Sequence, residues 1–314
     1  MPTPPPMRIA AIGSFFAGGR TVTVGGQPPK LIEMSQDIPA YRFDPNGTYA
    51  INHTYVSYVL PVDTDRPPVV FVPGGGMTGA CWESTPDGRP GWLTGFLRAG
   101  WPCYLIDNAG RGRAGWNCLL GSRSDEPVPR GAEECWTAFR IGPAGDYATR
   151  EPFPGSMFPV GALPELVRQM VPRWTTTNEL EVAALLAVVR RVGHCVLVGH
   201  SQGGGFAARV AQAAPHTVLA TVLLEPHGLP ERPTGPQLIV LGDNLEQSAV
   251  TNRLMPVWKT YRESGGLVDL LDLPGVGLRG NSHLPMADIN SDTVASLIRE
   301  WIEKTLSNIG QHRC

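Results

Sequence analysis

The chain has 314 residues, of which 42% are hydrophobic and 17% charged, and its formal net charge at pH 7 is −2. This composition is sufficient for a globular core, and the near-neutral charge without a Lys/Arg run argues against nucleic acid or an anionic membrane as a partner. No stretch approaches the roughly 18 apolar residues of a membrane span, and the first residues lack the apolar core of a signal peptide.

Along the chain, segments with strand character alternate with segments of helical periodicity. Two β-rich segments at 8–12 and 20–24 flank Gly18 and Gly19, which predicts an N-terminal hairpin, and the partly alternating segment at 54–60 is typical of an edge or antiparallel strand. Short apolar runs predict strands covered on both faces at 69–72, 104–106, 195–198, 218–224, 238–241 and 267–273, and helical patterns lie at 179–192, 202–214, 255–264 and 292–306. The order predicts an α/β fold, with a mostly parallel central sheet and helices on both faces.

The segment at 114–178, after the fourth predicted strand, is far longer than a connection requires. In a doubly wound sheet it falls above the carboxyl ends of the strands, where ligands bind, and its aromatic content argues against disorder. We therefore interpret it as a cap inserted into a core formed by residues 1–113 and 179–314.

The strand at 195–198 runs into the segment Gly199–Gly203, with Ser201 at its centre, and then directly into a helix. This is the G-x-S-x-G nucleophile elbow in its strand-turn-helix setting, where small residues on either side allow a strained turn to expose the serine. Ser201 is thus the predicted nucleophile of a serine hydrolase.

A serine hydroxyl needs a histidine base, and the base needs an orienting acid. In enzymes with this elbow the order along the chain is serine, acid, histidine. His283 lies in a loop between the last predicted strand and the last long helix, which makes it the predicted base. Two acids end neighbouring strands, Glu225 and Asp243, and spacing alone leaves the choice between them open.

For the oxyanion hole we expect the backbone N–H of Gln202 and one from the glycine loop after the strand at 69–72, with Gly75 as first choice and Gly76 as second. The six cysteines show no metal-binding spacing, and the glycine loop lacks the Lys-Ser/Thr of a phosphate-binding loop, so we expect no metal, nucleotide or other cofactor. Cys118 and Cys135 would pair only in an oxidising compartment, and reduced thiols are the default expectation.

The elbow and the segment Asp107–Gly112 resemble those of the α/β-hydrolase superfamily. More narrowly, the chain resembles a small branch of bacterial carboxylesterases in five segments: Gly13–Arg20, Met77–Gly79, Gly110–Arg113, Glu225–Pro226 and Gly280–His283. The resemblance implies that Glu225 is the triad acid, that the protein is a homodimer, and that export is an alternative to the cytoplasmic location favoured by the sequence as written. That alternative, periplasmic or secreted, requires a signal peptide to have been removed. The branch carries two adjacent cysteines where this chain has Gly75 and Gly76.

Together these features predict hydrolysis of a small, largely apolar carboxylic ester through a serine acyl-enzyme. A lactonase, thioesterase or acyltransferase would use the same residues, and a non-catalytic ligand-binding module would retain the same pocket. We expect Trp82, Trp116 and Trp136 to line an apolar substrate pocket, because such sites are mostly apolar with few polar groups.

Overall fold

The computed structural model describes residues 6–116 and 126–311. The strands are β1 (Ile9–Val24), β2 (Lys30–Ile32), β3 (Tyr41–Phe43), β4 (Gly47–Pro61), β5 (Val69–Val72), β6 (Cys103–Asp107), β7 (Cys195–His200), β8 (Val218–Leu224), β9 (Pro236–Leu241) and β10 (Leu267–Asp272). The helices are α1 (Ala80–Glu83), α2 (Trp92–Arg98), α3 (Ala132–Ala138), α4 (Leu163–Arg168), α5 (Asn178–Val192), α6 (Gln202–Ala213), α7 (Ala249–Glu263) and α8 (Ser291–Gln311).

Eight strands form one sheet in the order β1-β4-β6-β5-β7-β8-β9-β10. From β6 to β10 all neighbours are parallel, whereas β4 is antiparallel to both β1 and β6. Every residue of β5 and β7 is buried, as expected of strands covered on both faces. The predicted α/β fold with a mostly parallel sheet is confirmed, and the segment at 54–60 is the antiparallel strand rather than the edge strand.

Two apolar layers lie on opposite faces of this sheet. Val69 and Phe71 of β5 pack with side chains of α2 and α8, whereas the alternate residues Val70 and Val72 pack with those of α5, α6 and α7. This alternation follows from the period of two in a strand, which sends successive side chains to opposite faces. Helices therefore cover both faces, and ligands have access at the carboxyl ends of the parallel strands.

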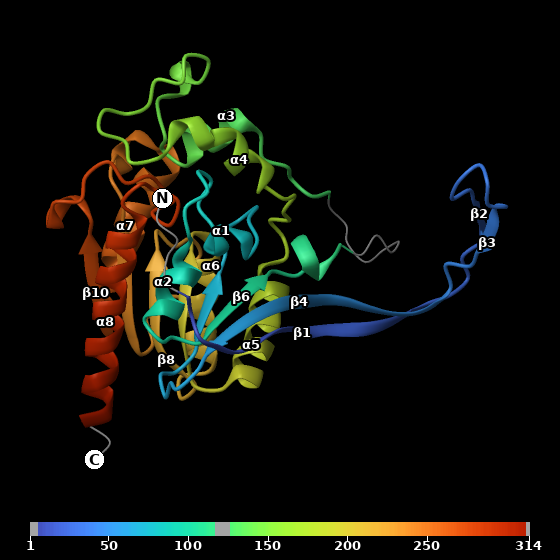
Figure 1. Ribbon diagram of the computed structural model, residues 1–314, viewed down its shortest axis with the longest axis horizontal. Helices are drawn as coiled ribbons and strands as arrows, with labels where there is room; N and C mark the ends of the chain where they lie inside the picture. The colour runs from blue at the N-terminus through green and yellow to red at the C-terminus, as the bar shows by residue number, and fades with distance from the viewer. Residues whose placement is uncertain (1–5, 117–125, 312–314) are drawn as a thin grey trace.

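The predicted hairpin between the segments at 8–12 and 20–24 is wrong, because both segments belong to a single strand that pairs with β4. Gly18 and Gly19 lie inside the continuous strand β1, and β1 pairs with β4 over nearly its whole length. A Cβ on Gly18 would lie 2.8 Å from Ala184 Cα, and one on Gly19 would lie 2.4 Å from Ile51 O. The two glycines thus permit close backbone approach instead of making a turn. Beyond them, β1 and β4 leave the body as a long ribbon with β2 and β3 at its tip (Figure 1).

The insertion covers the top of the molecule, where α3 and α4 lie above the strand ends (Figure 1). Backbone hydrogen bonds join it to the rest of the chain: Met157 N donates to Gly280 O at 2.8 Å, and Val171 N donates to Gly76 O at 2.9 Å. These contacts place the insertion directly over the loops that carry the candidate site residues. The division of the chain into core and cap units stays a prediction.

Cys135 is a buried free thiol, and its predicted alternative partner Cys118 lies outside the described residues. Within the described ranges, the helices are too short or too polar to cross a membrane.

Candidate active site

Ser201 lies at the junction of β7 and α6 in a backbone conformation that few non-glycine residues adopt, with φ 53° and ψ −118°. The turn is crowded: a Cβ on Gly199 would lie 2.5 Å from Gly203 O, and a Cβ on Gly203 would lie 2.4 Å from Pro73 O. Only glycine fits at these two positions. The local sequence therefore dictates the strained turn that the nucleophile elbow requires.

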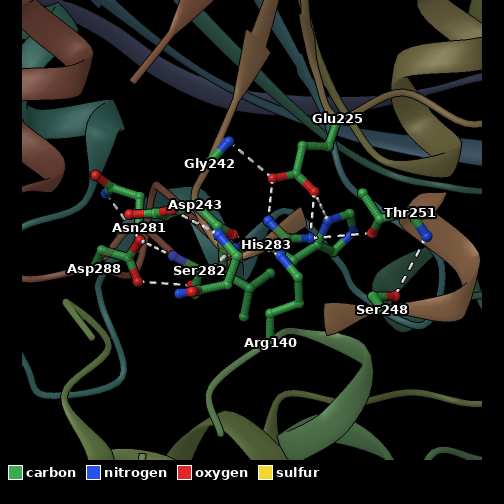
Figure 2. Close-up of polar contacts among 12 residues, drawn as sticks. Arg140, Glu225, Gly242, Asp243, Ser248, Thr251, Asn281, Ser282, His283 and Asp288 are labelled. Atoms are coloured by element: carbon green, nitrogen blue, oxygen red, sulfur yellow. Dashed lines mark hydrogen bonds and ion pairs between the residues drawn. The ribbon is translucent and has the colours of Figure 1, made fainter. Parts of the chain in front are cut away.

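His283 and Glu225 form a direct pair, with His283 Nδ1 2.6 Å from Glu225 Oε2. Glu225 follows β8 and is 1% exposed, and Gly242 N, after β9, donates to its Oε1 at 3.0 Å. Figure 2 shows the carboxylate held between Gly242, His283 and Arg140. The structure thus brings together the predicted base and the acid that the resemblance favours.

Arg140, from the insertion, makes a two-pronged ion pair with Glu225. Its Nη1 donates to Glu225 Oε2 at 2.7 Å, its Nη2 donates to Oε1, and its Nε donates to Asp243 O at 2.9 Å. Arg140 is itself buried and has a positive φ of 55°. Sequence reasoning missed this residue, because an arginine in an irregular segment carries no signal of a partner 85 positions away.

The charge of Glu225 follows from these partners. Burial by itself would raise the pKa of its carboxyl group, but Arg140 and His283 outweigh that effect and hold the pKa well below its usual range. An ionised carboxylate only accepts hydrogen bonds, so His283 Nδ1 carries the proton that it donates to Glu225. His283 Nε2 is then left as the basic nitrogen.

Asp243, the alternative acid, has other partners. Its Oδ2 accepts a hydrogen bond from Gly280 N at 2.8 Å, and its Oδ1 accepts one from Asn244 N at 2.8 Å. Its carboxylate therefore supports the backbone just before His283 instead of contacting the imidazole.

The loop that carries His283 is fixed by a second buried carboxylate, that of Asp288. Ser282 Oγ and Ser282 N donate to it at 2.7 and 2.8 Å, and Asn281 Nδ2 donates at 3.0 Å (Figure 2). Burial raises the pKa of Asp288 to about 7, although these hydrogen bonds act in the opposite direction. On the other side, Phe139 stacks on the imidazole with ring centroids 5.9 Å apart, and its carbonyl accepts from His283 N.

A cavity of about 440 Å³ contains Ser201 and His283 together with Gly75 and Gln202. In the described part of the chain no hydrogen bond joins Ser201 Oγ to His283. Such contacts are often long without substrate and tighten when it binds.

Two of the predicted oxyanion-hole residues, Gly75 and Gln202, line this cavity, whereas Gly76 is not among its lining residues. Arg111 ties the two parts of the candidate hole together: its Nη1 donates to Gly74 O at 3.3 Å and its Nη2 donates to Gln202 Oε1 at 2.9 Å. This buried arginine joins the glycine loop to the start of α6.

The three tryptophans expected in the pocket lie elsewhere. Trp82 is fully buried and packs against Phe71, and Trp136 is fully buried with its Nε1 donating to Pro143 O at 2.8 Å. Trp116 is 58% exposed beside Trp174. None of the three lines the cavity. The large apolar surfaces of Trp82 and Trp136 are used in packing within the core and the insertion, and Trp116 lies at the surface.

The cavity is also more polar than expected. Its walls include Phe139, Phe206 and Val250, but also three arginines and one glutamate: Arg130, Arg173, Arg209 and Glu134. The expectation of an apolar pocket lined by tryptophans is thus wrong for this cavity, whose walls combine apolar and charged side chains.

Two further histidines lie beside His283. His200 is buried, and His227 lines the cavity with its ring centroid 5.9 Å from that of His283. Burial lowers the pKa of His200 well below its ordinary value and that of His227 to about 4, and the neighbouring His283 lowers both further. Both are therefore neutral near pH 7. Within the described ranges, no cluster of three His, Cys, Asp or Glu side chains could hold a metal ion.

Two comparisons give individual relatives. A structure described as a novel bacterial esterase is 32% identical, with a TM-score of 0.81 over 97% of this chain and 99% of that one. A probable secreted lipase from Fungal sp. (strain ATCC 74256) is 26% identical over 82% of this chain and 88% of its own length. Each likeness extends over most of the chain and not only over the elbow, and the bacterial esterase shares the architecture as well.

The model of the alpha/beta hydrolase family matches residues 69–272, from β5 to β10. That range includes the elbow, the insertion and both candidate acids, and it ends shortly before the loop of His283. With the sheet order, the strained Ser201 turn and the bacterial esterase as further support, the chain belongs to the alpha/beta hydrolase family and is a hydrolase of the esterase or lipase type.

Proposed function

We propose that the protein hydrolyses carboxylic esters through an acyl-enzyme on Ser201. The observation that carries this proposal is the buried Glu225–His283 pair, 2.6 Å apart, with His283 in the wall of the cavity that also contains Ser201 at its strained turn. That set of a nucleophile, a base and an orienting acid is what acyl transfer requires. The bacterial and fungal relatives, described as an esterase and a lipase, support the same reaction class.

In the proposed mechanism Ser201 Oγ attacks the ester carbonyl carbon while its proton passes to His283 Nε2. Glu225 stabilises the imidazolium that forms, and the N–H groups of Gly75 and Gln202 bind the developing oxyanion. The carbon–oxygen bond to the alcohol then breaks as His283 returns the proton to the leaving oxygen. Water, deprotonated by the same histidine, hydrolyses the acyl-enzyme and releases the acid.

The fungal relative is described as secreted, which supports export as the alternative to a cytoplasmic location for this chain. A lactone or thioester would fit the same mechanism, because both react at an acyl carbon attached to a leaving group. Comparing kcat/KM for an ester, a lactone and a thioester with the same protein ranks these acyl donors.

The proposal is tested by trapping the acyl-enzyme. Mixing the protein with a p-nitrophenyl ester should release a burst of nitrophenolate matching the enzyme concentration. A phosphonate inhibitor should lose its leaving group to Ser201 Oγ and add the mass of its phosphonyl group to the peptide that contains Ser201. The matched control, Ser201→Ala, loses only a hydroxyl group and should keep its fold while turnover falls on the order of 10⁴-fold or more. Undiminished turnover by purified Ser201→Ala, or no turnover by the wild type with any acyl donor, would refute the proposal and favour a binding module.

A further inference from the structure

Two arginines contributed by the insertion stand in the wall of the candidate active site. Arg130 and Arg173 line the same cavity as Ser201, and their side chains are only 11% and 16% exposed. Removing a guanidinium group from water is costly unless hydrogen bonds or counter-charges replace the water. The partners of these two side chains therefore indicate what the cavity is built to hold.

The two arginines share a single carboxylate. Arg130 Nη1 lies 3.1 Å and Arg173 Nη2 lies 3.6 Å from the same oxygen, Glu134 Oε1. Arg130 Nε and Arg173 Nη1 are buried and have no hydrogen-bond partner in the described part of the chain. Burial, and then the charge of Arg173, lower the pKa of Arg130, as expected where positive charge is incompletely compensated. Counted against the Glu134 carboxylate, the partner that they share among the described residues, the pair thus has one positive charge and two N–H donors in excess.

The other arginines at the site have better-matched partners. Arg209 also lines the cavity, but its Nη2 donates to Glu179 Oε1 at 2.7 Å. Arg140, behind His283, is paired with Glu225. The excess of positive charge is therefore concentrated at Arg130 and Arg173.

This pair adjoins the glycine loop expected to form the oxyanion hole. A Cβ on Gly75 would lie 3.3 Å from Arg173 Cδ, and one on Gly76 would lie 3.7 Å from Arg173 Nη1 and 3.9 Å from Arg130 Nε. The backbone of Arg173 is paired with that of Val128 by two hydrogen bonds, from Val128 N to Arg173 O at 2.7 Å and from Arg173 N to Val128 O at 3.1 Å. The backbone of Arg173 is thus held beside the loop expected to form the oxyanion hole, which favours a preorganised site.

We propose that Arg130 and Arg173 bind an ionised carboxylate on the substrate, so that the preferred substrates are esters that carry a second, free acid group. A carboxylate supplies the negative charge and the acceptor oxygens that the pair lacks, and arginine binds carboxylates with two parallel hydrogen bonds. The choice of substrate rests on the proposed esterase function, whereas binding of the acid group does not. It revises the expectation of a largely apolar ester.

The test compares matched substrates that differ only in charge. Monoethyl esters of succinic, glutaric and adipic acid are each compared with the ethyl ester in which the free carboxylate is replaced by a carboxamide. For the best-fitting length, kcat/KM should favour the acid over the amide by about 10- to 100-fold, since charge-assisted hydrogen bonds are roughly twice as strong as neutral ones. The preference should weaken as salt concentration rises.

Variants then assign the preference to residues. Arg130→Gln and Arg173→Gln should each remove most of it, chiefly by raising KM for the acid, so that kcat/KM falls more for the acid than for the amide. Glu134→Gln, which removes the competing carboxylate, should increase it. Arg209→Gln is the matched control, because Arg209 lines the same cavity but is paired with Glu179, and it should leave the preference unchanged.

Calorimetric titration with glutarate separates the two proposals. If the wild type binds glutarate and Arg173→Gln does not, but no ester is hydrolysed, the anion site is supported and the esterase function is refuted. If esters are hydrolysed with no preference for the acid and glutarate does not bind, the anion site is refuted and the esterase function stands. Stronger competition by inorganic phosphate than by glutarate would overturn the assignment to a carboxylate.

Discussion

At the scale of single residues, the site depends on a buried carboxylate whose partners all lie on other segments of the chain. Glu225 accepts hydrogen bonds from Arg140, His283 and Gly242, so both of its oxygens are satisfied away from water. A buried ion pair of this kind costs desolvation to form, and removal of one member leaves the other charged and unpaired. Conservative changes at these residues should therefore have large effects, and they should differ according to which partner is lost.

Glu225→Gln should lower turnover on the order of 10²- to 10⁴-fold, because the neutral amide supports neither the tautomer nor the cation of His283. Asp243→Asn is the matched control: its carboxylate bonds backbone N–H groups of Gly280 and Asn244, and the amide oxygen can replace only part of that, so a loss of less than about 10-fold is expected. Steady-state kinetics with one ester decides between them. A larger loss in Asp243→Asn would make Asp243 the functional acid.

Arg140→Gln should destabilise the protein by about 3–5 kcal/mol, because Glu225 is left buried without its main counter-charge. Burial would then raise the pKa of Glu225, so activity should be lost at a higher pH on the acid side than in the wild type. Arg140→Lys keeps the charge but not the two parallel hydrogen bonds. It should therefore restore part of the lost stability and part of the activity lost on the acid side. Urea unfolding and pH–rate profiles measure the two effects, and a profile unchanged in Arg140→Gln would show that Arg140 is only a packing residue.

At the scale of elements, the insertion belongs to the active site as well as covering it. The short segment after α3 supplies Phe139 and Arg140 to the His283–Glu225 pair, and the segment before α3 supplies Arg130 to the cavity. Within the loop between β10 and α8, the Asp288 carboxylate accepts hydrogen bonds from Asn281 and Ser282, next to His283. Precise placement of His283 thus requires two loops from distant parts of the chain to be ordered together.

The Asp288 carboxyl group should make stability depend on pH. The pKa of this group is 3.8 for an unperturbed Asp, as in the unfolded chain, and about 7 in the folded protein. Between pH 3.8 and pH 7 the folded protein therefore holds a proton that the unfolded chain has released. This contribution to stability is present below pH 3.8 and is lost as pH rises through about 7. In Asp288→Asn that component should disappear. From pH 5 to pH 8 the melting temperature of the wild type should therefore fall relative to that of the variant. A constant difference between the two would contradict the prediction.

At the scale of the whole molecule, the β1–β4 ribbon stands out from the body (Figure 1). Its tip carries exposed apolar side chains, with Leu31 73% and Met34 67% exposed. An isolated two-stranded ribbon is marginal in water, and clustered exposed apolar groups mark contact surfaces. We propose that the ribbon packs against a second copy of the chain, as it would in the homodimer that the resemblance implies.

Light scattering after size-exclusion chromatography should show a dimer for the wild type. The double variant Leu31→Asp/Met34→Lys should be monomeric or at least 10-fold weaker in association, because charges at both positions would be buried in the contact. Val276→Asp, at an exposed apolar position between β10 and α8, is the control and should remain dimeric. A monomeric wild type, or a double variant that associates as strongly, would exclude the ribbon as the contact.

The features readable from the sequence were those encoded locally. The apolar runs of β5 to β10, the periodicity of α5 and α6, and the glycines around Ser201 depend on neighbours within a few positions, so the fold class and the elbow could be predicted from them. Chain order and its position in the loop before the last helix pointed to His283, which the structure places in the same cavity as Ser201. Glu225 required the resemblance as well, because spacing cannot tell which of two neighbouring strand ends directs a carboxylate towards the imidazole.

Tertiary structure decided what depends on residues far apart in the chain. The apparent turn at Gly18 and Gly19 became a point of close backbone approach, because β1 finds its partner in β4, beyond the whole β2–β3 segment. Trp82 and Trp136 entered the core instead of the pocket, since burial of a large ring depends on the surrounding shape and not on its place in the sequence. Arg140 carries no local pattern, and only folding of the insertion over the strand ends brings it to Glu225. Arg130 pairs with Glu134 four positions away, but the same folding is needed to place Arg130 and Arg173 in the cavity wall with Ser201.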